Sequence, residues 1–198
     1  NPVVDIAMPD PTVIKATDGY FYVYATESTR NVPIMKSKDL VEWTYCNTAF
    51  TNKTRPRFEP KAGIWAPDIN YINGKYVLYY AMSVWGGEQT CGIGVATADS
   101  PQGPFTDHGK MFRSNEIGVQ NSIDPSLLQY EGRNYLVWGS FRGIYVIELT
   151  ADGLSIMPGA KKKRIAGTAF EAVISISTAI IIICLLHRKL LSRSEKYI

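Results

Sequence analysis

Apolar residues between about residues 10 and 160 occur in short runs of strand length. Runs of this kind, bounded by residues that favour turns, are typical of β-strands. The turn signals are Asp18-Gly19, Asn73-Gly74, Gly86-Gly87, Ser100-Pro101, Gly103-Pro104 and Glu131-Gly132. No segment in this range repeats its apolar residues with a helical period. The pattern therefore predicts an all-β body.

One arrangement of these runs occurs three times, with copies that begin at Asp10, Ala66 and Asp124. In each copy, an Xaa-Pro pair with a carboxylate in it or beside it leads through a turn into a run rich in Tyr or Trp. The starts lie 56 and 58 residues apart, a spacing that indicates one supersecondary unit per copy, as in propeller blades. Further strands are predicted at Gly92–Ala98 and Ile144–Leu149, as third strands of their units, and at Ser37–Trp43, as the edge of the first unit.

The repeats therefore predict about three blades of four strands each. A radial arrangement would bring the carboxylate ends of the first strands together on one axis. Three blades cannot close, because closed propellers usually have about four to eight. We expect later residues or a partner to supply the remainder.

The character of the chain changes at about residue 172, which divides it into a body at 1–172 and a tail at 173–198. Val173–Leu186 is almost wholly apolar, and Arg188 and Lys189 follow it. One interpretation is a short membrane anchor at residues 173–186. This run of about 15 residues is shorter than the 18 or more that a spanning helix normally needs, so we expect no membrane association.

The other interpretation is a fourth blade read in a shifted frame. A fourth repeat is due near Glu171, and it should continue into a Tyr-rich strand. Isoleucine codons are AT-rich, and codons can be chosen for Ile180–Leu186 that read as Tyr-Tyr-Tyr-Leu-Phe-Ala-Ser two bases along. Such a shift would account for an off-pattern tail.

Charge and cysteine content exclude some classes of function. The formal net charge of +3 is small and gives no reason to expect a nucleic-acid partner. Three cysteines without tight spacing indicate neither a disulfide framework nor a zinc site. The two histidines are too far apart for a metal cluster, and His108 is predicted to lie in a turn. The chain begins at Asn1-Pro2, as though a signal peptide or an upstream part had been removed. We predict a secreted or periplasmic location, with membrane anchoring by residues 173–186 as the alternative.

Four segments together resemble the signature segments of glycoside hydrolase family 43. They are Met8–Ile14, Trp65–Asp68, Asn121–Leu127 and Thr168–Ala172. Trp138-Gly139-Ser140-Phe141, followed by Gly143-Ile144, is most similar to the arabinan-degrading members, the endo-1,5-alpha-L-arabinosidases. The resemblance covers residues 1 to about 172 and implies a five-bladed β-propeller with its active site at the axis. Here only about three blades and the off-pattern apolar C-terminal tail would be present.

The resemblance implies hydrolysis with inversion by three carboxylates. Asp10 would be the general base, Glu171 the general acid, and Asp124 the residue that positions the acid and tunes its pKa. An inverting enzyme needs its base and acid about 6.5 to 9.5 Å apart, so that a water fits beside the sugar. Residues at the inner ends of different blades can meet that separation. A nearby second carboxylate raises the pKa of an acid by like-charge repulsion.

Four further residues are candidates for substrate binding. Trp65 and Trp85 could stack on a furanose ring, because a sugar face carries C–H groups that pack on an aromatic plane. Asp68 is interpreted as structural or as a sugar contact. Ser140 could bond either the substrate or the backbone.

The leading prediction is an O-glycosyl hydrolase of α-1,5-linked arabinan or arabino-oligosaccharides, with arabinoxylan and xylosides as other substrates. Its partner would be a plant cell-wall polysaccharide. No cofactor is predicted. The arabinan-degrading members carry a histidine, often with a metal ion beneath the site, in a later blade, and no residue here matches it. The alternative is a non-catalytic glycan-binding or membrane-tethered propeller fragment. The exact glycan, endo or exo action and the activity of this chain stay open.

Overall fold

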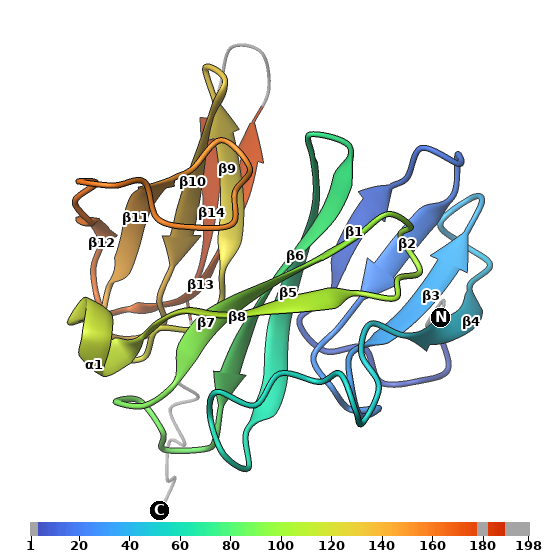
Figure 1. Cartoon of the computed structure of the whole chain (residues 1–198), viewed down its shortest axis with the longest axis horizontal. Coiled ribbons are helices and arrows are strands. Elements are labelled where there is room, and N and C mark those ends of the chain that lie inside the picture. The colour runs from blue at the N-terminus through green and yellow to red at the C-terminus, as the bar shows by residue number, and fades with distance from the viewer. Residues whose placement is uncertain (1–3, 178–181, 189–198) are drawn as a thin grey trace, which may run out of the picture.

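The computed structural model describes residues 4–177 and 182–188. Three four-stranded antiparallel sheets follow one another along the chain, and each runs in sequence order (Figure 1). The first sheet contains β1 (Thr12–Lys15), β2 (Phe21–Tyr24), β3 (Pro33–Ser37) and β4 (Thr44–Thr48). The second contains β5 (Gly63–Ile72), β6 (Lys75–Ser83), β7 (Gly92–Ala98) and β8 (Thr106–Arg113). The third contains β9 (Ser126–Tyr130), β10 (Arg133–Trp138), β11 (Ile144–Leu149) and β12 (Lys163–Ala166).

Two smaller elements complete the described structure. A single helical turn, α1 (Ser114–Ile117), follows β8. A two-stranded hairpin of β13 (Phe170–Ser177) and β14 (Ile182–Arg188) follows the third sheet. The prediction of an all-β body with three four-stranded units is confirmed.

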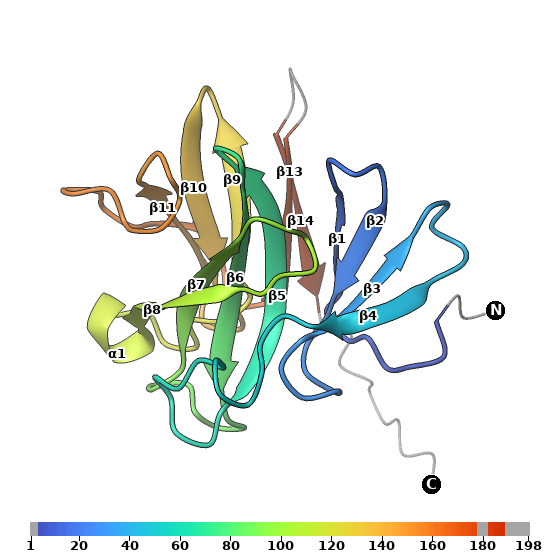
Figure 2. The same cartoon turned by 45° about the vertical axis from the view of Figure 1, so that its right-hand side comes forward.

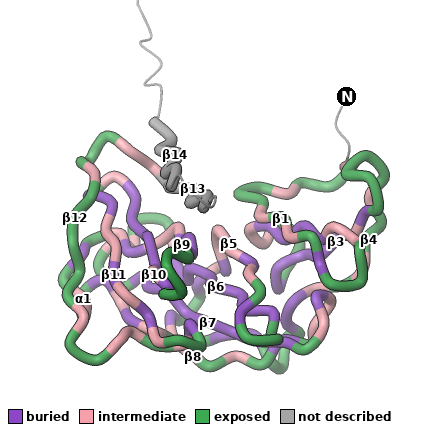
Figure 3. Tube along the Cα trace, turned by 90° about the horizontal axis from the view of Figure 1, so that it is seen from above, coloured by how far each residue is buried: buried purple, intermediate pink, exposed green. Residues whose placement is uncertain are grey.

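The sheets stand side by side around a common inner side (Figures 1 and 2). β1 contacts β5, β5 contacts β9, and β9 contacts β13. The view from above shows β1, β5 and β9 toward the middle and β4, β8 and β12 on the periphery (Figure 3). This is the radial arrangement that the repeat predicts, and it brings the starts of the first strands together.

Two hydrophobic clusters join the sheets. The first lies between the first and second sheets and includes Tyr24, Ile34 and Tyr80. The second lies between the second and third sheets and includes Tyr79 and Trp138. Successive residues of a strand face opposite sides of its sheet, so β6 contributes side chains to both clusters. Because both of its faces are buried, its sequence is almost wholly apolar.

The hairpin between β5 and β6 has the predicted two-residue turn. Asn73 and Gly74 have φ angles of 49° and 83°. Positive φ at both central residues is the geometry of a type I′ turn, which matches the twist of the flanking strands. The prediction from the Asn-Gly pair is therefore confirmed.

The prediction of an edge strand at Ser37–Trp43 is wrong, because the edge strand is β4. The Asp39 carboxylate accepts the backbone N–H groups of Val41 and Glu42, each at 2.9 Å. The Ser37 hydroxyl accepts the N–H of Leu40 at 2.9 Å. Short polar side chains that bond neighbouring backbone groups compete with strand pairing, and they make this segment a turn.

His108 lies in β8, so the prediction of a turn there is also wrong. The pairing of β7 with β8 shifts register between Gly94 and Ala96, which leaves His108 and Gly109 in a bulge. Gly109 has a φ of 84°, which is the conformation that glycine supplies in turns and bulges alike. The glycine at position 109 therefore indicates a bulge in the strand and not a turn.

In the tail, β13 and β14 pair antiparallel, with register partners that include Val173 with Leu186 and Ser177 with Ile182. The remainder of the predicted tail, residues 178–181 and 189–198, lies outside the described residues. Within the described ranges, α1 has four residues, and no helix has the length and apolar character required to cross a bilayer.

Candidate active site at the inner strand ends

One cleft of about 1390 Å³ opens where the first strands begin. Its lining comes from the starts of β1, β5 and β9, from β13, and from the loops that follow β6 and β10. All seven residues singled out from the sequence line it: Asp10, Trp65, Asp68, Trp85, Asp124, Ser140 and Glu171. The fold therefore collects residues that span 161 positions of the chain into one cavity.

The two aspartates that open repeats share an unusual backbone conformation. Asp10 and Asp124 have φ angles of 48° and 57°, and each precedes a proline. Ala66, which opens the second repeat, has a φ of 42° and also precedes a proline. Positive φ is uncommon outside glycine, and proline further restricts the residue before it. A positive φ before proline thus occurs near the inner end of all three sheets, ahead of β1 and β9 and inside β5. Strain of this kind clusters at functional sites.

Asp124 is the carboxylate with the strongest electrostatic perturbation in the cleft. Burial, followed by repulsion from the carboxylate of Asp10 and then from that of Glu171, raises the pKa of Asp124 to about 8. A hydrogen bond from the Ser140 side chain acts in the opposite direction. The three carboxylates are therefore close enough for Asp10 and Glu171 to disfavour the ionised form of Asp124.

Asp10 is held by a residue that the sequence analysis missed. The Thr26 hydroxyl donates to Oδ2 of Asp10 at 2.6 Å. The same oxygen of Thr26 accepts the backbone N–H of Ala66 at 2.7 Å. Thr26 thus connects the inner ends of the first and second sheets, and it also lines the cleft.

Glu171 lies near the start of β13, beside β9. The backbone N–H of Phe141 donates to the carbonyl of Phe170 at 2.8 Å. This bond ties the loop after β10 to the residue immediately before Glu171. The short segment from Ser140 to Phe141 therefore contacts both Asp124 and the strand of Glu171.

Asp68 accepts two protein hydrogen bonds through one carboxylate oxygen. Its Oδ2 accepts the backbone N–H of Leu127 at 2.7 Å and the Asn70 side-chain amide at 2.7 Å. Burial raises the pKa of Asp68 to about 6, and these two bonds oppose the rise. Because Leu127 belongs to β9, Asp68 links the second sheet to the third, which favours the structural interpretation over the sugar contact.

Two tryptophans form an aromatic wall of the cleft. The ring centroids of Trp65 and Trp85 are 5.6 Å apart, with their planes tilted by 51°. Trp85 is 95% exposed, an unusual state for so large an apolar side chain. It stands on the loop after β6, where it has room to receive a ligand.

A salt bridge fixes the loop that carries Trp85. Arg142 donates from Nε and Nη2 to the two carboxylate oxygens of Glu88, at 2.9 and 3.0 Å. Glu88 lines the cleft, and Arg142 belongs to the loop after β10. No sequence pattern indicates this pair, because its members lie 54 residues apart.

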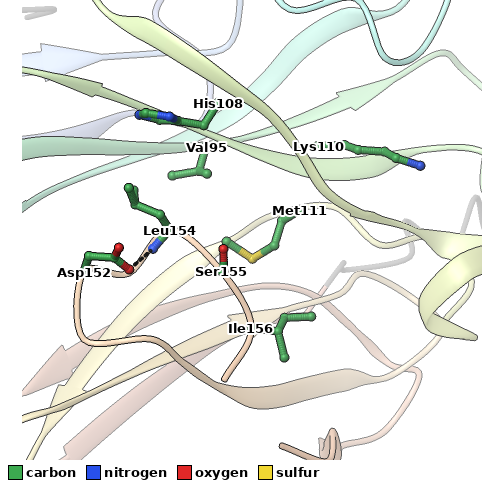
Figure 4. A pocket seen from close by; sticks show the side chains of 8 residues that line it. All are labelled: Val95, His108, Lys110, Met111, Asp152, Leu154, Ser155 and Ile156. Carbon is green, nitrogen blue, oxygen red and sulfur yellow. Dashed lines mark hydrogen bonds between the residues drawn. The ribbon is translucent and has the colours of Figure 1, made fainter. Parts of the chain in front are cut away.

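A second, smaller pocket of about 420 Å³ shares no lining residue with the first cleft. Figure 4 shows the side chains that line it. It is formed by Val95 of β7, by β8 and by the loop after β11, and its residues include His108, Lys110 and Asp152. His108 Nε2 lies 2.7 Å from the Thr97 hydroxyl oxygen, and Asp152 accepts the Thr150 hydroxyl at 2.5 Å. These polar groups are therefore engaged within the protein.

The donor set does not fit a metal ion. Among residues 4–177 and 182–188, no group of three or more His, Cys, Asp or Glu side chains has the arrangement of a metal site. His108 lines the second pocket and is absent from the lining of the carboxylate cleft.

Comparison with known proteins identifies relatives of this architecture. Residues 1–179 match the family model described as glycosyl hydrolases family 43. The extracellular endo-alpha-(1->5)-L-arabinanase 1 of Bacillus subtilis is 38% identical over 177 residues, which cover 82% of this chain and 54% of that protein. The arabinan endo-1,5-alpha-L-arabinosidase A of Aspergillus niger is 32% identical over 137 residues, or 67% of this chain and 41% of that protein. The chain thus spans about half the length of these curated relatives.

Solved structures show the same fold over part of their length. The native arabinanase of Bacillus subtilis superposes with a TM-score of 0.76 at 32% identity, covering 88% of this chain and 63% of that one. The Cellvibrio cellulosa alpha-L-arabinanase complexed with arabinohexaose reaches a TM-score of 0.82 at 24% identity, covering 95% and 67%. The second likeness shows the fold alone. The predicted resemblance is confirmed: three propeller-type sheets and a match over most of the chain make this protein a member of the glycosyl hydrolases family 43.

Proposed function

We propose that this protein hydrolyses α-1,5-linked arabinan or arabino-oligosaccharides with inversion of configuration. The observation that carries the proposal is the convergence of Asp10, Asp124 and Glu171, from three different sheets, in one cleft with mutual electrostatic repulsion. Asp10 acts as the general base toward water, and Glu171 as the general acid toward the leaving oxygen. Groups on different sheets can flank a sugar from opposite faces, as inversion requires.

Asp124 positions the proposed acid. Its carboxyl lies close enough to Asp10 and Glu171 for both to disfavour its ionised form. The Ser140 side chain bonds Asp124, and the next residue, Phe141, bonds the carbonyl of Phe170, which precedes Glu171. These contacts support for Asp124 the positioning and tuning role that the resemblance implies.

Arabinan is favoured as substrate by the relatives whose names specify arabinan or arabinanase. The Trp65 and Trp85 rings supply the apolar surface on which a furanose can pack. Arabinoxylan is the second substrate to test. The name of the Bacillus subtilis relative includes the word extracellular, which supports a secreted or periplasmic location for this protein.

The test is release of reducing ends from linear α-1,5-arabinan, with arabinoxylan and xylan in parallel. Asp10→Asn and Glu171→Gln remove the base and the acid while they keep side-chain shape, and each should lower kcat about 10²- to 10⁴-fold. Asp99→Asn is the matched control, because the Asp99 side chain is 84% exposed and is absent from the cleft. Binding of arabino-oligosaccharides without product from the unmodified protein would instead support the glycan-binding alternative.

We further propose that residues 173–198 derive from a shifted reading frame of a fourth blade. The proposal rests on the fourth repeat that is due near Glu171 and on the change of character after residue 172. Sequencing the DNA across the codons for Glu171 to Ile198 tests this. Another frame that encodes a Tyr-rich strand after Glu171 would support the proposal, and the lack of any such frame would contradict it.

A further inference from the structure

The inner ends of the three sheets share a second position besides the strained residue before proline. Thr26 follows Asp10 by sixteen residues, Met82 follows Ala66 by sixteen, and Ser140 follows Asp124 by sixteen. Each of these later residues follows a small residue, Ala25, Ala81 or Gly139. In the first and third repeats this later residue follows the second strand, whereas Met82 lies within β6 and pairs with Ile64 of β5.

The residue type at the start of each repeat and the residue type sixteen positions later change together. In the first repeat, the Thr26 hydroxyl donates to the Asp10 carboxylate at 2.6 Å. In the third, the Ser140 side chain is hydrogen-bonded to the Asp124 carboxylate. In the second, the opening residue is Ala66, and the later position holds the buried thioether of Met82. A hydroxyl is thus present where the opening residue is an aspartate, and absent where it is not.

The second repeat also shows that the turn does not need the hydroxyl. Ala66 adopts a φ of 42°, close to the 48° of Asp10 and the 57° of Asp124. The backbone conformation is therefore the same without a carboxylate and without a hydroxyl donor from its own sheet. What Thr26 and Ser140 add is control of the carboxylate side chain.

We propose that Thr26 and Ser140 are equivalent positioning residues, whose hydroxyl groups hold the carboxylates of Asp10 and Asp124 in the geometry required for hydrolysis. The Thr26 hydroxyl occupies Oδ2 of Asp10 and restrains rotation of that side chain, which leaves Oδ1 for the cleft. The Ser140 hydroxyl restrains Asp124 by the same kind of bond. Both Thr26 and Ser140 line that cleft. Ser140 is therefore reassigned from substrate binding to positioning, and Thr26 is added to the site.

The inference rests on the proposed function, and four variants test it. Thr26→Val and Ser140→Ala remove the hydroxyls, whereas Thr26→Ser and Ser140→Thr retain them. A hydrogen bond to a charged group supports a loss of about 10- to 100-fold in kcat when it is removed. We expect that loss in Thr26→Val and Ser140→Ala, with KM within about twofold because substrate contacts remain. The hydroxyl-retaining variants should stay within about threefold of the unmodified protein. Met82→Leu, at the equivalent position of the second repeat, should leave kcat unchanged.

Two measurements judge the inference independently of activity. The first is a ¹³C NMR titration of the Asp124 carboxyl, which faces Asp10, Glu171 and Ser140. Loss of a donor to the ionised form should shift its midpoint to higher pH in Ser140→Ala, and Ser140→Thr should restore it. The second is a double-mutant cycle of Thr26→Val with Asp10→Ala on unfolding, which should be non-additive because the residues contact each other.

The outcomes separate the two proposals. An unmodified protein that does not cleave arabinan overturns the proposed function, while a shifted Asp124 titration and a non-additive cycle still support the positioning role. Conversely, cleavage that persists in Thr26→Val and Ser140→Ala with kcat within twofold overturns the positioning role alone. An unchanged Asp124 titration with an additive cycle also overturns it.

Discussion

The backbone N–H of Phe141 donates to the carbonyl of Phe170 across the boundary between the third sheet and β13. Phe141 follows Ser140, which bonds Asp124, and Phe170 precedes Glu171. One backbone hydrogen bond therefore couples the position of the proposed acid to the loop that holds its neighbour. A hydrogen bond between main-chain groups leaves no pattern of side chains in the sequence. This one nevertheless helps to place the carboxylates of Asp124 and Glu171 relative to each other.

The first prediction concerns Asp124 and the pH dependence of stability. The folded-state pKa of about 8 exceeds the value of about 3.9 for an unfolded aspartate. Between these pH values the folded state binds more protons, so the contribution of Asp124 to stability declines as pH rises from about 4 to 8. Asp124→Asn should remove this decline and raise the free energy of unfolding at pH 8 by a few kcal/mol, on the order expected from the pKa difference.

Chemical denaturation of both proteins at pH 4.5 and pH 8 checks this. The variant should gain stability at pH 8 and little at pH 4.5, while kcat falls. A stability difference that is the same at both pH values would contradict the raised pKa. Asp99→Asn controls for the general effect of removing a negative charge.

The second prediction concerns the ion pair between Arg55 and Glu27. Arg55 donates to both carboxylate oxygens of Glu27, at 2.9 and 2.8 Å, and the two side chains are only 6% and 10% exposed. Glu27 also accepts the backbone N–H of Ile64 at 2.9 Å, which links the first sheet to the second. Removing one partner of a buried pair leaves an uncompensated charge.

Arg55→Met should therefore lower the free energy of unfolding by about 3 to 5 kcal/mol. Arg57→Met is the matched control, because Arg57 is exposed and bonds only the carbonyl of Asn52 among the side-chain contacts described for it. Urea denaturation should show a small effect for Arg57→Met. Equal losses in the two variants would show that the buried pair has no special role.

The third prediction separates crowding from backbone strain at glycine. Gly153 and Gly159 have φ angles of 74° and 82°, so an alanine would be strained at either position. A Cβ at Gly153 would lie 2.5 Å from the Tyr79 hydroxyl oxygen, whereas a Cβ at Gly159 has no atom within 4 Å. Tyr79 is buried, and its hydroxyl donates to the carbonyl of Gly153 at 2.8 Å.

Gly159→Ala should cost about 1 kcal/mol, from conformation alone. Gly153→Ala should cost at least about 1 to 3 kcal/mol more, because overpacking adds to the strain. Thermal unfolding measured side by side checks the order. Similar melting temperatures would mean that Tyr79 can move away without loss.

The fourth prediction concerns Trp85 in substrate binding. A platform that stacks on sugar contributes about 0.5 to 1.5 kcal/mol beyond burial of area, so Trp85→Ala should raise KM for arabino-oligosaccharides about 2- to 10-fold with kcat little changed. Its melting temperature should hardly change, because the ring is 95% exposed. Tyr71→Ala, at an exposed aromatic outside the cleft, is the control. An unchanged KM would remove Trp85 from the binding site.

Much of the fold could be predicted because its signals are local. The alternation of apolar runs with Gly and Asn turns specified the strands, and the repeated Xaa-Pro pairs located Asp10 and Asp124 at equivalent inner ends. The error at Ser37–Trp43 arose because side-chain bonds to the backbone outweigh an apolar pattern there. The error at His108 arose because Gly109 gives the same sequence signal in a bulge as it would in a turn.

The parts of the site that escaped prediction depend on tertiary contacts. The pairing of Glu88 with Arg142 joins two loops on different sheets. Burial is the largest cause of the raised pKa of Asp124. A sequence motif does not show which of its residues will be buried. Thr26 did have a signal, the sixteen-residue interval shared by the repeats, but its meaning appears only when the Asp10 contact is known.

The most direct test of the central claim is the stereochemistry of the first product, followed by ¹H NMR as the protein acts on a linear α-1,5-arabino-oligosaccharide. Inversion by Asp10 and Glu171 predicts that the β-anomer of the new reducing end appears first, before mutarotation, and that Asp10→Asn and Glu171→Gln abolish its appearance. An α-anomer formed first would contradict an inverting mechanism, and unimpaired cleavage by either variant would contradict the assignment of these carboxylates.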